Sequence, residues 1–398
     1  MQRAFSLLTL CFLACATTGG KAMVKAEEPP VQVLDLGQDL GQGNLLLVQA
    51  WVDSTDYAST WSLSGRLENY FEQAKSQHWL SPKTVVVLAE RWADGLLFAE
   101  EDPAVYQART LDDAYKLLAN KYLVDILLRW PGAKGDDRIR SSVHQLKAEA
   151  LRKSYQLMMS KIAREYGVTL VGGCLLLPAP RVEAGEIAIT VDKPLQRACF
   201  VFGPDGQVLD PPTLPQHLRG DDRALAEASS APLPVYQTAA GTLRLLAGDD
   251  MWVSASSTHL GGTGPELIVA LQDLPVRSGW TQSWNPDVTA GDIQGLQTAG
   301  LTYQDAVMKY GLPARLTQAG AAAGGVVYLS GRAWDRHHDG QVLAIKGDQV
   351  SAGPRAEAPV LVNLWLGVAP PPEPVVEPEP APPPKKPAKK TTRKRRGS

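Results

Sequence analysis

Apolar and polar residues alternate along the chain in blocks that predict strands and helices in turn. Residues 44–52 form an apolar run of the length expected for a strand that is buried on both faces. Apolar side chains then recur at spacings of three and four over 63–74, which indicates an amphipathic helix. The β-branched run 84–88 predicts a second strand. A strand, a covering helix and a parallel second strand make a βαβ unit.

The same patterns continue toward the carboxyl end of the chain. Helices are predicted over 110–130, 143–166 and 303–310, and Gly167 is placed to cap the second. Residues 338–340, His-Asp-Gly, are predicted to turn the last hairpin. Strands are predicted at 168–177, 198–202, 266–271, 325–330, 341–345 and 359–366, with two short strands around a turn at 239–241. A further strand and the turn that follows it are predicted over 243–252.

The segment 1–22 is typical of an export signal. It holds a single Arg3, an apolar run over 4–13 that is too short to span a bilayer, and small residues after it. Residues 12–15, Phe-Leu-Ala-Cys, resemble a bacterial lipobox, so Cys15 is either lipidated or lost by cleavage nearby. We therefore expect an exported protein of the periplasm or cell envelope, tethered to the outer membrane if Cys15 carries lipid, with residues 23–43 as a linker.

The segment 367–398 differs in composition from the rest of the chain. It is a Pro-rich spacer followed by a basic end, with too few apolar residues to form a core. From Val368 onward eight Lys or Arg face three Glu, about +5, which leaves about −7 on the rest of a chain whose formal net charge is −2. We expect a disordered tail that binds an anionic envelope surface. An exported protein is not expected to bind nucleic acid.

Two of the four cysteines, Cys11 and Cys15, lie in the export signal. The other two, Cys174 and Cys199, lie in predicted strands that are candidate hairpin neighbours. An oxidising compartment would allow a disulfide between them. Two buried, unpaired thiols are the favoured interpretation, and the bridge is the alternative.

Candidate chemistry is concentrated where a predicted strand ends. The apolar run that begins at Leu243 stops abruptly at Gly248, Asp249 and Asp250, and Trp252 follows. The edge of a sheet, where strands end, is where α/β proteins place their chemistry. A nucleophile is expected in this stretch, and Asp249, Asp250 and Trp252 are candidates for a cleft.

Several separated segments resemble, in order, those of the carbon–nitrogen hydrolase (nitrilase) superfamily. They are the strand 84–88 with Glu90 after it, the helix and strand 163–173, the hairpin 198–206, the strand 264–270 and the closing strands from 326. The resemblance covers residues 44–366. It implies a single α/β domain with a four-layer α-β-β-α sandwich that pairs with another copy of itself and needs no cofactor.

The resemblance also implies a site built from a glutamate, a lysine and a cysteine. The carboxylate takes the thiol proton, the thiolate attacks a nitrile or amide carbon, and the lysine stabilises the developing charge. Glu90 occupies the general-base position. Pro215 falls closest to the lysine position, and Gly248 stands where the cysteine is expected, so two of the three groups are missing.

These losses favour an exported carbon–nitrogen hydrolase-like protein that is catalytically inactive. It would act by binding a partner or a small amide- or nitrile-like ligand. The alternative is an active hydrolase of non-peptide amide or nitrile bonds that uses Glu90 and an unidentified nucleophile. A purely structural carboxylate at a strand end is a further interpretation of Glu90.

Other combinations of residues are weaker candidates. Asp249 and Asp250 would form a cation site with Glu90 only if neighbours on one strand pointed to the same face, which they do not. Ser256 or Ser257 with His259 lacks an acid to orient the histidine. His337 and His338 are interpreted as a solvated turn. No metal site is therefore predicted.

Overall fold

The computed structural model describes residues 27–130, 135–253, 256, 266–285, 293, 296–297, 299–355 and 357–367. The predicted export signal with Cys15, the residues Ser257 and His259, and the tail beyond Gly367 lie outside the described residues. All described elements belong to one unit, Met1–Gly367.

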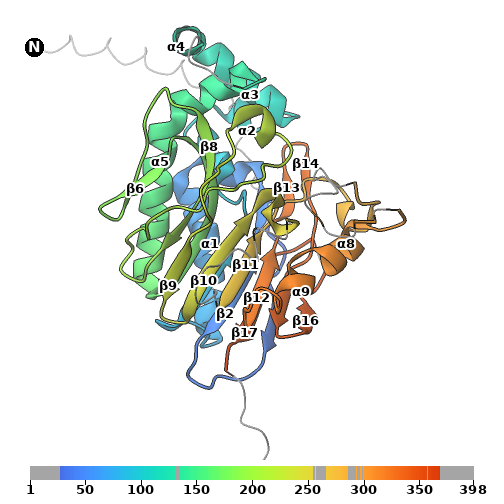
Figure 1. The fold of residues 1–398 in the computed structure, drawn as a ribbon. Coiled ribbons are helices and arrows are strands. Elements are labelled where there is room, and N and C mark those ends of the chain that lie inside the picture. Colours follow the sequence, from blue (N-terminus) through green and yellow to red (C-terminus); the bar gives the residue numbers. More distant parts are fainter. Residues whose placement is uncertain are drawn as a thin grey trace, which may run out of the picture. The chain divides into compact units, whose positions relative to one another are not determined.

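Two six-stranded sheets form the centre of the domain (Figure 1). Buried runs such as Leu-Leu-Leu-Val in β2 and Val-Val-Val-Leu in β4 supply strands that are covered on both faces. The first sheet has the order β1 (Gln32–Leu36), β17 (Val360–Trp365), β2 (Asn44–Gln49), β4 (Thr84–Leu88), β5 (Thr169–Pro178) and β8 (Leu195–Phe202). The second has the order β16 (Gln349–Ala352), β15 (Leu343–Lys346), β12 (Ala323–Val327), β11 (Leu267–Leu271), β10 (Gly241–Ala247) and β9 (Val235–Thr238).

The two sheets pack face to face and share the larger hydrophobic core. Gly325 of β12 packs against Leu47 of β2, and a Cβ at Gly325 would lie only 2.4 Å from Leu47 Cδ1. Two smaller sheets lie outside this pair. They are β14 (Arg336–His338), β13 (Ser330–Ala333) and β3 (Trp51–Asp53), and the hairpin β6 (Arg181–Glu183) with β7 (Glu186–Ala188).

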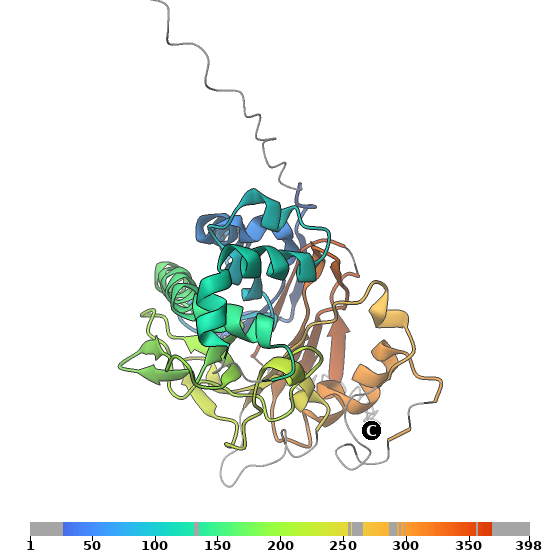
Figure 2. The same cartoon turned by 90° about the horizontal axis from the view of Figure 1, so that it is seen from above.

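Helices cover the outer face of each sheet. On the first sheet lie α1 (Thr60–Ser76) and α5 (Arg138–Tyr166), and on the second lie α8 (Tyr303–Tyr310) and α9 (Leu312–Arg315), as Figure 2 also shows. The predicted four-layer α-β-β-α sandwich is thus confirmed. The remaining helices within the described residues are α2 (Pro103–Tyr106), α3 (Leu111–Lys121), α4 (Leu123–Arg129) and α6 (Asp222–Leu225), with 3-10 turns at Ser54–Ala58 (η1), Asp94–Phe98 (η2), Gly248–Met251 (η3) and Gly279–Thr281 (η4).

Most predicted elements are present. The βαβ unit is confirmed, since β2 and β4 are parallel and α1 connects them. Gly167 ends α5 in the left-handed conformation, with φ of 63°. In the part of the chain that the structure describes, no helix combines the length and apolar character needed to cross a membrane.

Three expectations need correction. The predicted linker contains β1, which pairs with β17 and extends the first sheet. The predicted helix 110–130 is two helices, because the chain turns at Tyr122. Residues 338–340 do not turn the last hairpin, which is formed by β15 and β16.

Candidate functional site

Glu90 and Gly248 come from different sheets and meet at one end of the sandwich. Glu90 lies two residues beyond the end of β4, and Gly248 directly follows β10. A Cβ built on Gly248 would lie 4.0 Å from Glu90 Oε1. The structure thus brings together the two positions that the sequence singled out for the base and the nucleophile.

The surroundings of Gly248 leave no room for a side chain. Its φ is +58°, a conformation that residues with a Cβ rarely adopt. A Cβ there would lie 2.8 Å from the carbonyl oxygen of His217, which is closer than real Cβ atoms approach. The same oxygen accepts a hydrogen bond from the backbone N–H of Asp249 at 3.0 Å. The His217 carbonyl and the Asp249 N–H, which are hydrogen-bonded to each other, therefore occupy the space that a nucleophilic side chain at position 248 would need.

The backbone of Gly248 also accepts a hydrogen bond from a buried side chain. The side chain of Gln272, which follows β11, donates from Nε2 to the carbonyl oxygen of Gly248 at 2.8 Å. Gln272 is fully buried. The turn at Gly248 is therefore fixed between the His217 loop and the end of β11.

The Glu90 side chain is 2% exposed. Burial raises its pKa from 4.5 to about 7, although the nearby cations Arg91 and Arg197 act in the opposite direction. Among the described residues, none donates a hydrogen bond to this carboxylate. Glu90 therefore changes its charge near neutral pH, which is a property of a general base.

A cation is present near Glu90, but it is not at the predicted position. Pro215 is buried and accepts a hydrogen bond through its backbone oxygen from Ser229. Arg219 lies four residues later, and its Nη1 donates to Gln272 Oε1 and to the Tyr303 hydroxyl, each at 3.4 Å. Arg219 was not among the residues predicted from the sequence, although it directly follows the His217-Leu218 pair.

The charge of Arg219 is set by its surroundings. Burial disfavours the charged form, but Tyr303 and the carboxylates of Asp249 and Asp273 outweigh this effect and raise the pKa of Arg219 above its ordinary value. Glu90 also contributes to this rise. Arg219 is therefore a permanent cation in this part of the molecule.

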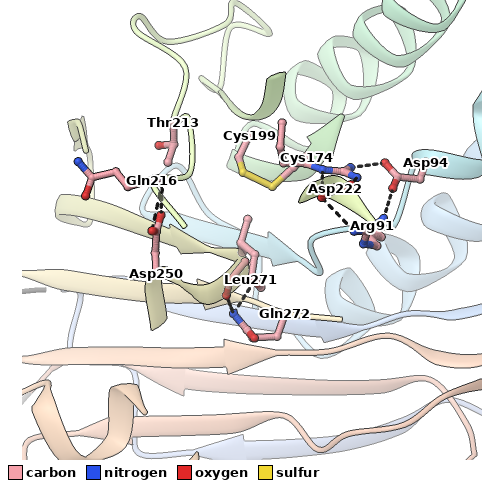
Figure 3. The surroundings of a disulfide bond; sticks show 12 residues. Arg91, Asp94, Cys174, Cys199, Thr213, Gln216, Asp222, Asp250, Leu271 and Gln272 are labelled. Atoms are coloured by element: carbon pink, nitrogen blue, oxygen red, sulfur yellow. Dashed lines mark hydrogen bonds and ion pairs between the residues drawn. A yellow bond between two sulfur atoms is a disulfide. The ribbon is translucent and has the colours of Figure 1, made fainter. Parts of the chain in front are cut away.

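The two aspartates after Gly248 are engaged separately. Asp250 accepts from His217 Nδ1 at 2.8 Å and from the His217 backbone N–H at 3.0 Å, and it also accepts from the Gln216 backbone N–H (Figure 3). Asp249 forms an ion pair with Arg223 at 3.1 Å. Across the described ranges no group of three or more His, Cys, Asp or Glu side chains is arranged to hold a metal ion.

Three other candidates lie in buried surroundings. Trp252 is 3% exposed, and its ring packs 5.1 Å from that of Trp284 in the core beneath α8. His338 is not in a solvated turn, because its side chain is only 8% exposed and its Nδ1 lies 2.7 Å from Asp273. Ser256 is buried, and both the alternative Ser257 and the histidine His259 lie outside the described residues.

A disulfide joins Cys174 and Cys199 next to the site (Figure 3). The favoured interpretation of two free thiols was therefore wrong. β5 and β8 are antiparallel, and an irregularity before Cys174 brings these two residues opposite each other. The Cys174 N–H donates to the Glu90 carbonyl at 2.7 Å, and Cys199 exchanges two backbone hydrogen bonds with Thr213. The bridge thus connects the turn at Glu90 with the segment that leads to His217.

A cavity of about 80 Å³ lies beside this site. That volume accommodates several water molecules or a small ligand. Its apolar wall combines aromatic and aliphatic side chains and includes Trp334, whose ring stacks on Tyr57. Its polar wall consists of four arginines and four aspartates, together with His144 and His338: Arg91, Arg140, Arg197, Arg336, Asp94, Asp221, Asp222 and Asp273.

These charged groups are paired with one another. Arg197 contacts Asp222 at 2.7 Å and Asp94 at 2.6 Å, and Arg91 contacts Asp222 at 2.9 Å (Figure 3). The two arginines outweigh the effect of burial and lower the pKa of Asp222 to about 2. Burial lowers the pKa of His144 to about 3, so it is neutral at physiological pH. The lining charges therefore nearly cancel.

Sequence comparison identified no relative: no protein-family description matches the chain, and no characterised protein resembles it closely in sequence. Comparison with solved structures did find similar folds. A cysteine-to-serine mutant of the Nesterenkonia AN1 amidase from the nitrilase superfamily aligns with a TM-score of 0.52 and 14% identity over 83% of this chain and 94% of the amidase.

A cysteine-to-alanine mutant of the same amidase, in complex with butyramide, aligns with a TM-score of 0.50 and 15% identity, covering 81% of this chain and 90% of the other. At such low identity the likeness concerns the fold. The order of the two sheets, the covering helices and these alignments agree, and the chain has the carbon–nitrogen hydrolase fold of the nitrilase-superfamily amidases.

Proposed function

We propose that this protein has kept the carbon–nitrogen hydrolase fold but acts by binding a small ligand and not by hydrolysis. The observation that carries the proposal is the closed turn at Gly248. The position next to the Glu90 base has no nucleophile, and the His217 carbonyl fills the space that a side chain would need. Without a nucleophile at this point no covalent acyl intermediate can form.

The similar amidase offers a contrast. A structure of a glutamate-to-glutamine mutant of that amidase shows covalent addition of the acetamide moiety of fluoroacetamide at the active site cysteine. In this chain Gly248 stands where resemblance places that nucleophile. The Asp249 N–H, a group of the kind that stabilises an oxyanion, is already bonded to His217. The chain therefore lacks both a nucleophilic side chain at position 248 and an Asp249 N–H that is available to stabilise an oxyanion.

The cavity indicates which ligand the protein would bind. Its arginines and aspartates are equal in number and paired, so a ligand with a net charge would leave one buried charge without compensation. A neutral or zwitterionic small molecule avoids this cost. The aromatic wall suits a planar group, and the ion pairs offer both donors and acceptors. A small amide fits these requirements.

The experiment is a thermal-shift and calorimetric screen of small amides, nitriles and zwitterions against the full chain. Arg336→Ala alters the cavity wall, and Arg181→Ala is a matched control because Arg181 forms an exposed ion pair with Glu183 on the β6–β7 hairpin. A ligand of the cavity should stabilise the wild type and the Arg181 variant but bind the Arg336 variant at least about tenfold more weakly. Equal binding to all three proteins would place the ligand elsewhere.

The proposal includes export to the cell envelope. The buried Cys174–Cys199 disulfide supports it, because such bridges form and persist in oxidising compartments. Lipidation at Cys15, pairing with a second copy and contact of the basic tail with an anionic surface are further parts of this proposal. Fractionation of cells that express the wild type and Cys15→Ala tests the anchor.

A second candidate function is hydrolysis through a group other than a side chain at position 248. The raised pKa of Glu90 and the cation of Arg219 favour it, because a base that titrates near pH 7 is suited to activate a nucleophile. Activity that depends on Glu90 would separate this function from the first.

A further inference from the structure

An exposed apolar face on helix α4 is not explained by the proposed function. Leu123, Val124, Leu127 and Leu128 are 53%, 71%, 59% and 74% exposed. They follow the i, i+1, i+4, i+5 spacing that places side chains on one side of a helix. Ile126, on the other side, is 3% exposed and belongs to the core. We call the four exposed residues the α4 face.

The α4 face lies at an extremity of the domain. Figure 1 shows α4 at the top of the molecule, beyond the ends of both sheets. The helix packs on α3 and α5, so its free side is directed away from the sandwich. Trp130, which is 37% exposed, directly follows α4. Tryptophan at the end of an apolar helix is typical of segments that lie in a membrane interface.

The described chain begins at this same end of the domain. Glu28 forms an ion pair with Arg66 at 2.7 Å, and Arg66 contacts Asp56 of η1. In η1, Ser54 donates to the backbone oxygen of Tyr106 in α2, which packs on α3. Glu28, near the start of the described residues, is therefore linked through these contacts to the part of the domain that carries the α4 face.

The residues before Glu27 contain the apolar run 4–13 and Cys15. An extended chain spans at most about 3.5 Å per residue, so the segment between Cys15 and Glu27 reaches about 40 Å. A membrane anchor on that segment would hold the α2–α3–α4 end of the domain close to the bilayer.

The size and charge of the face favour a bilayer over a second protein molecule. A helix of seven residues is only about 10 Å long, and its one face falls short of the roughly 800 Å² per partner that a stable dimer buries. The acidic residue on α4, Asp125, is paired with Arg129. Attachment would thus depend on apolar insertion and not on charge.

We propose that the α4 face inserts into the surface of a lipid bilayer and orients the domain with its α2–α3–α4 end toward the membrane. This inference does not rest on the ligand or on the loss of catalysis. It also differs from attachment through the basic tail, which would be weakened by salt.

The test uses the full chain with Cys11→Ala and Cys15→Ala, so that no lipid is attached, and vesicles of phosphatidylcholine with phosphatidylglycerol in about 1 M salt, where exposed charges are screened. Leu128→Glu should weaken vesicle binding by at least about tenfold. The matched control is Leu157→Glu, because Leu157 lies on α5 with an exposure of 73%, against 74% for Leu128. The control should bind as the parent chain does.

A second measurement distinguishes insertion of the α4 face from vesicle binding through the predicted export signal, residues 1–22. A polarity-sensitive dye is attached at Leu128→Cys or at Leu157→Cys in the same background, where the remaining cysteines form the buried disulfide. Insertion predicts that vesicles shift the emission of the dye at position 128 and leave that at 157 unchanged. Equal behaviour of the two dyes would overturn the proposal. A dimer that Leu128→Glu dissociates, with no change at vesicles, would also overturn it.

Discussion

The carbonyl oxygen of His217 lies 2.8 Å from the point where Gly248 would carry a Cβ, and it accepts a hydrogen bond from the residue that follows this glycine. Because of this contact, the site lacks both a nucleophilic residue at position 248 and the space for one. The loop that contains His217 would have to move before a side chain at position 248 could face Glu90.

The first prediction compares two glycines with nearly the same backbone conformation. Gly167 has a φ of +63° and open space around its Cβ position, whereas Gly248 has a φ of +58° and the His217 carbonyl against it. Gly167→Ala should lower the free energy of unfolding by about 1 kcal/mol, from backbone conformation alone. Gly248→Ala should cost about 3 kcal/mol. Urea denaturation measures the free energy of unfolding of both variants. Equal losses would show that the loop containing His217 moves aside at little cost.

The second prediction concerns Gly248→Cys. The substituted chain should not regain turnover, because its thiol has no space beside Glu90 and no free Asp249 N–H to stabilise an oxyanion. Intact-mass spectrometry after exposure to fluoroacetamide should show little adduct at this position. Rapid and complete labelling would mean that the His217 loop opens readily.

The third prediction follows from the raised pKa of Glu90. A carboxyl whose pKa is about 7 in the folded chain and about 4.5 unfolded binds more protons when folded. Its contribution to stability is full below about pH 4.5 and is lost as the pH rises to 7. The loss amounts to at most about 3 kcal/mol. Glu90→Gln should remove this dependence, so its stability relative to wild type should increase between pH 5 and 8.

Glu101 provides a control of opposite sign. Glu101 is buried, and its carboxylate forms ion pairs with Lys121 at 2.6 Å and with Lys147 at 2.5 Å. These two cations outweigh the effect of burial and lower the pKa of Glu101. Glu101→Gln should therefore destabilise the protein at neutral pH and have less effect in acid. Denaturation curves with the same pH profile for both variants would contradict these assignments.

The fourth prediction concerns the buried ion pairs beside the site. Arg197 is 2% exposed and connects Asp94 with Asp222. Arg197→Ala removes the closer of the two arginines that contact these carboxylates, and Arg91 remains beside them. The substitution should cost about 3 kcal/mol of stability. Arg181→Ala removes an exposed pair and should cost less than about 1 kcal/mol. A small loss for Arg197 would show that water or rearranged arginines replace it.

Much of the fold was predictable because apolar periodicity reports burial directly. The buried runs of β2 and β4 and the helix α8 were recognised in this way. β1 was missed because it is a short edge strand whose residues are only partly buried, flanked by polar sequence. Such a strand depends on its partner β17 for stability more than on its own composition.

The site was predictable only in part. Glu90 and Gly248 were recognised because the strand ends that carry them resemble those of the carbon–nitrogen hydrolase superfamily, and strand ends gather at one edge. The positions of the His217 carbonyl and of Arg219 depend on an irregular loop, whose conformation no periodic pattern specifies. The disulfide required the register of β5 and β8, which the irregularity before Cys174 determines.

The most direct test of the account is an assay of the purified wild type and Glu90→Ala on nitriles, linear amides and N-carbamoyl compounds. Ammonia release and acyl-adduct mass are measured across pH 5 to 9, so that both charge states of Glu90 are sampled. With no nucleophile at Gly248, neither protein should turn over any compound or form an adduct. Hydrolysis by the wild type that Glu90→Ala abolishes would contradict the account and show that another group has taken over the chemistry.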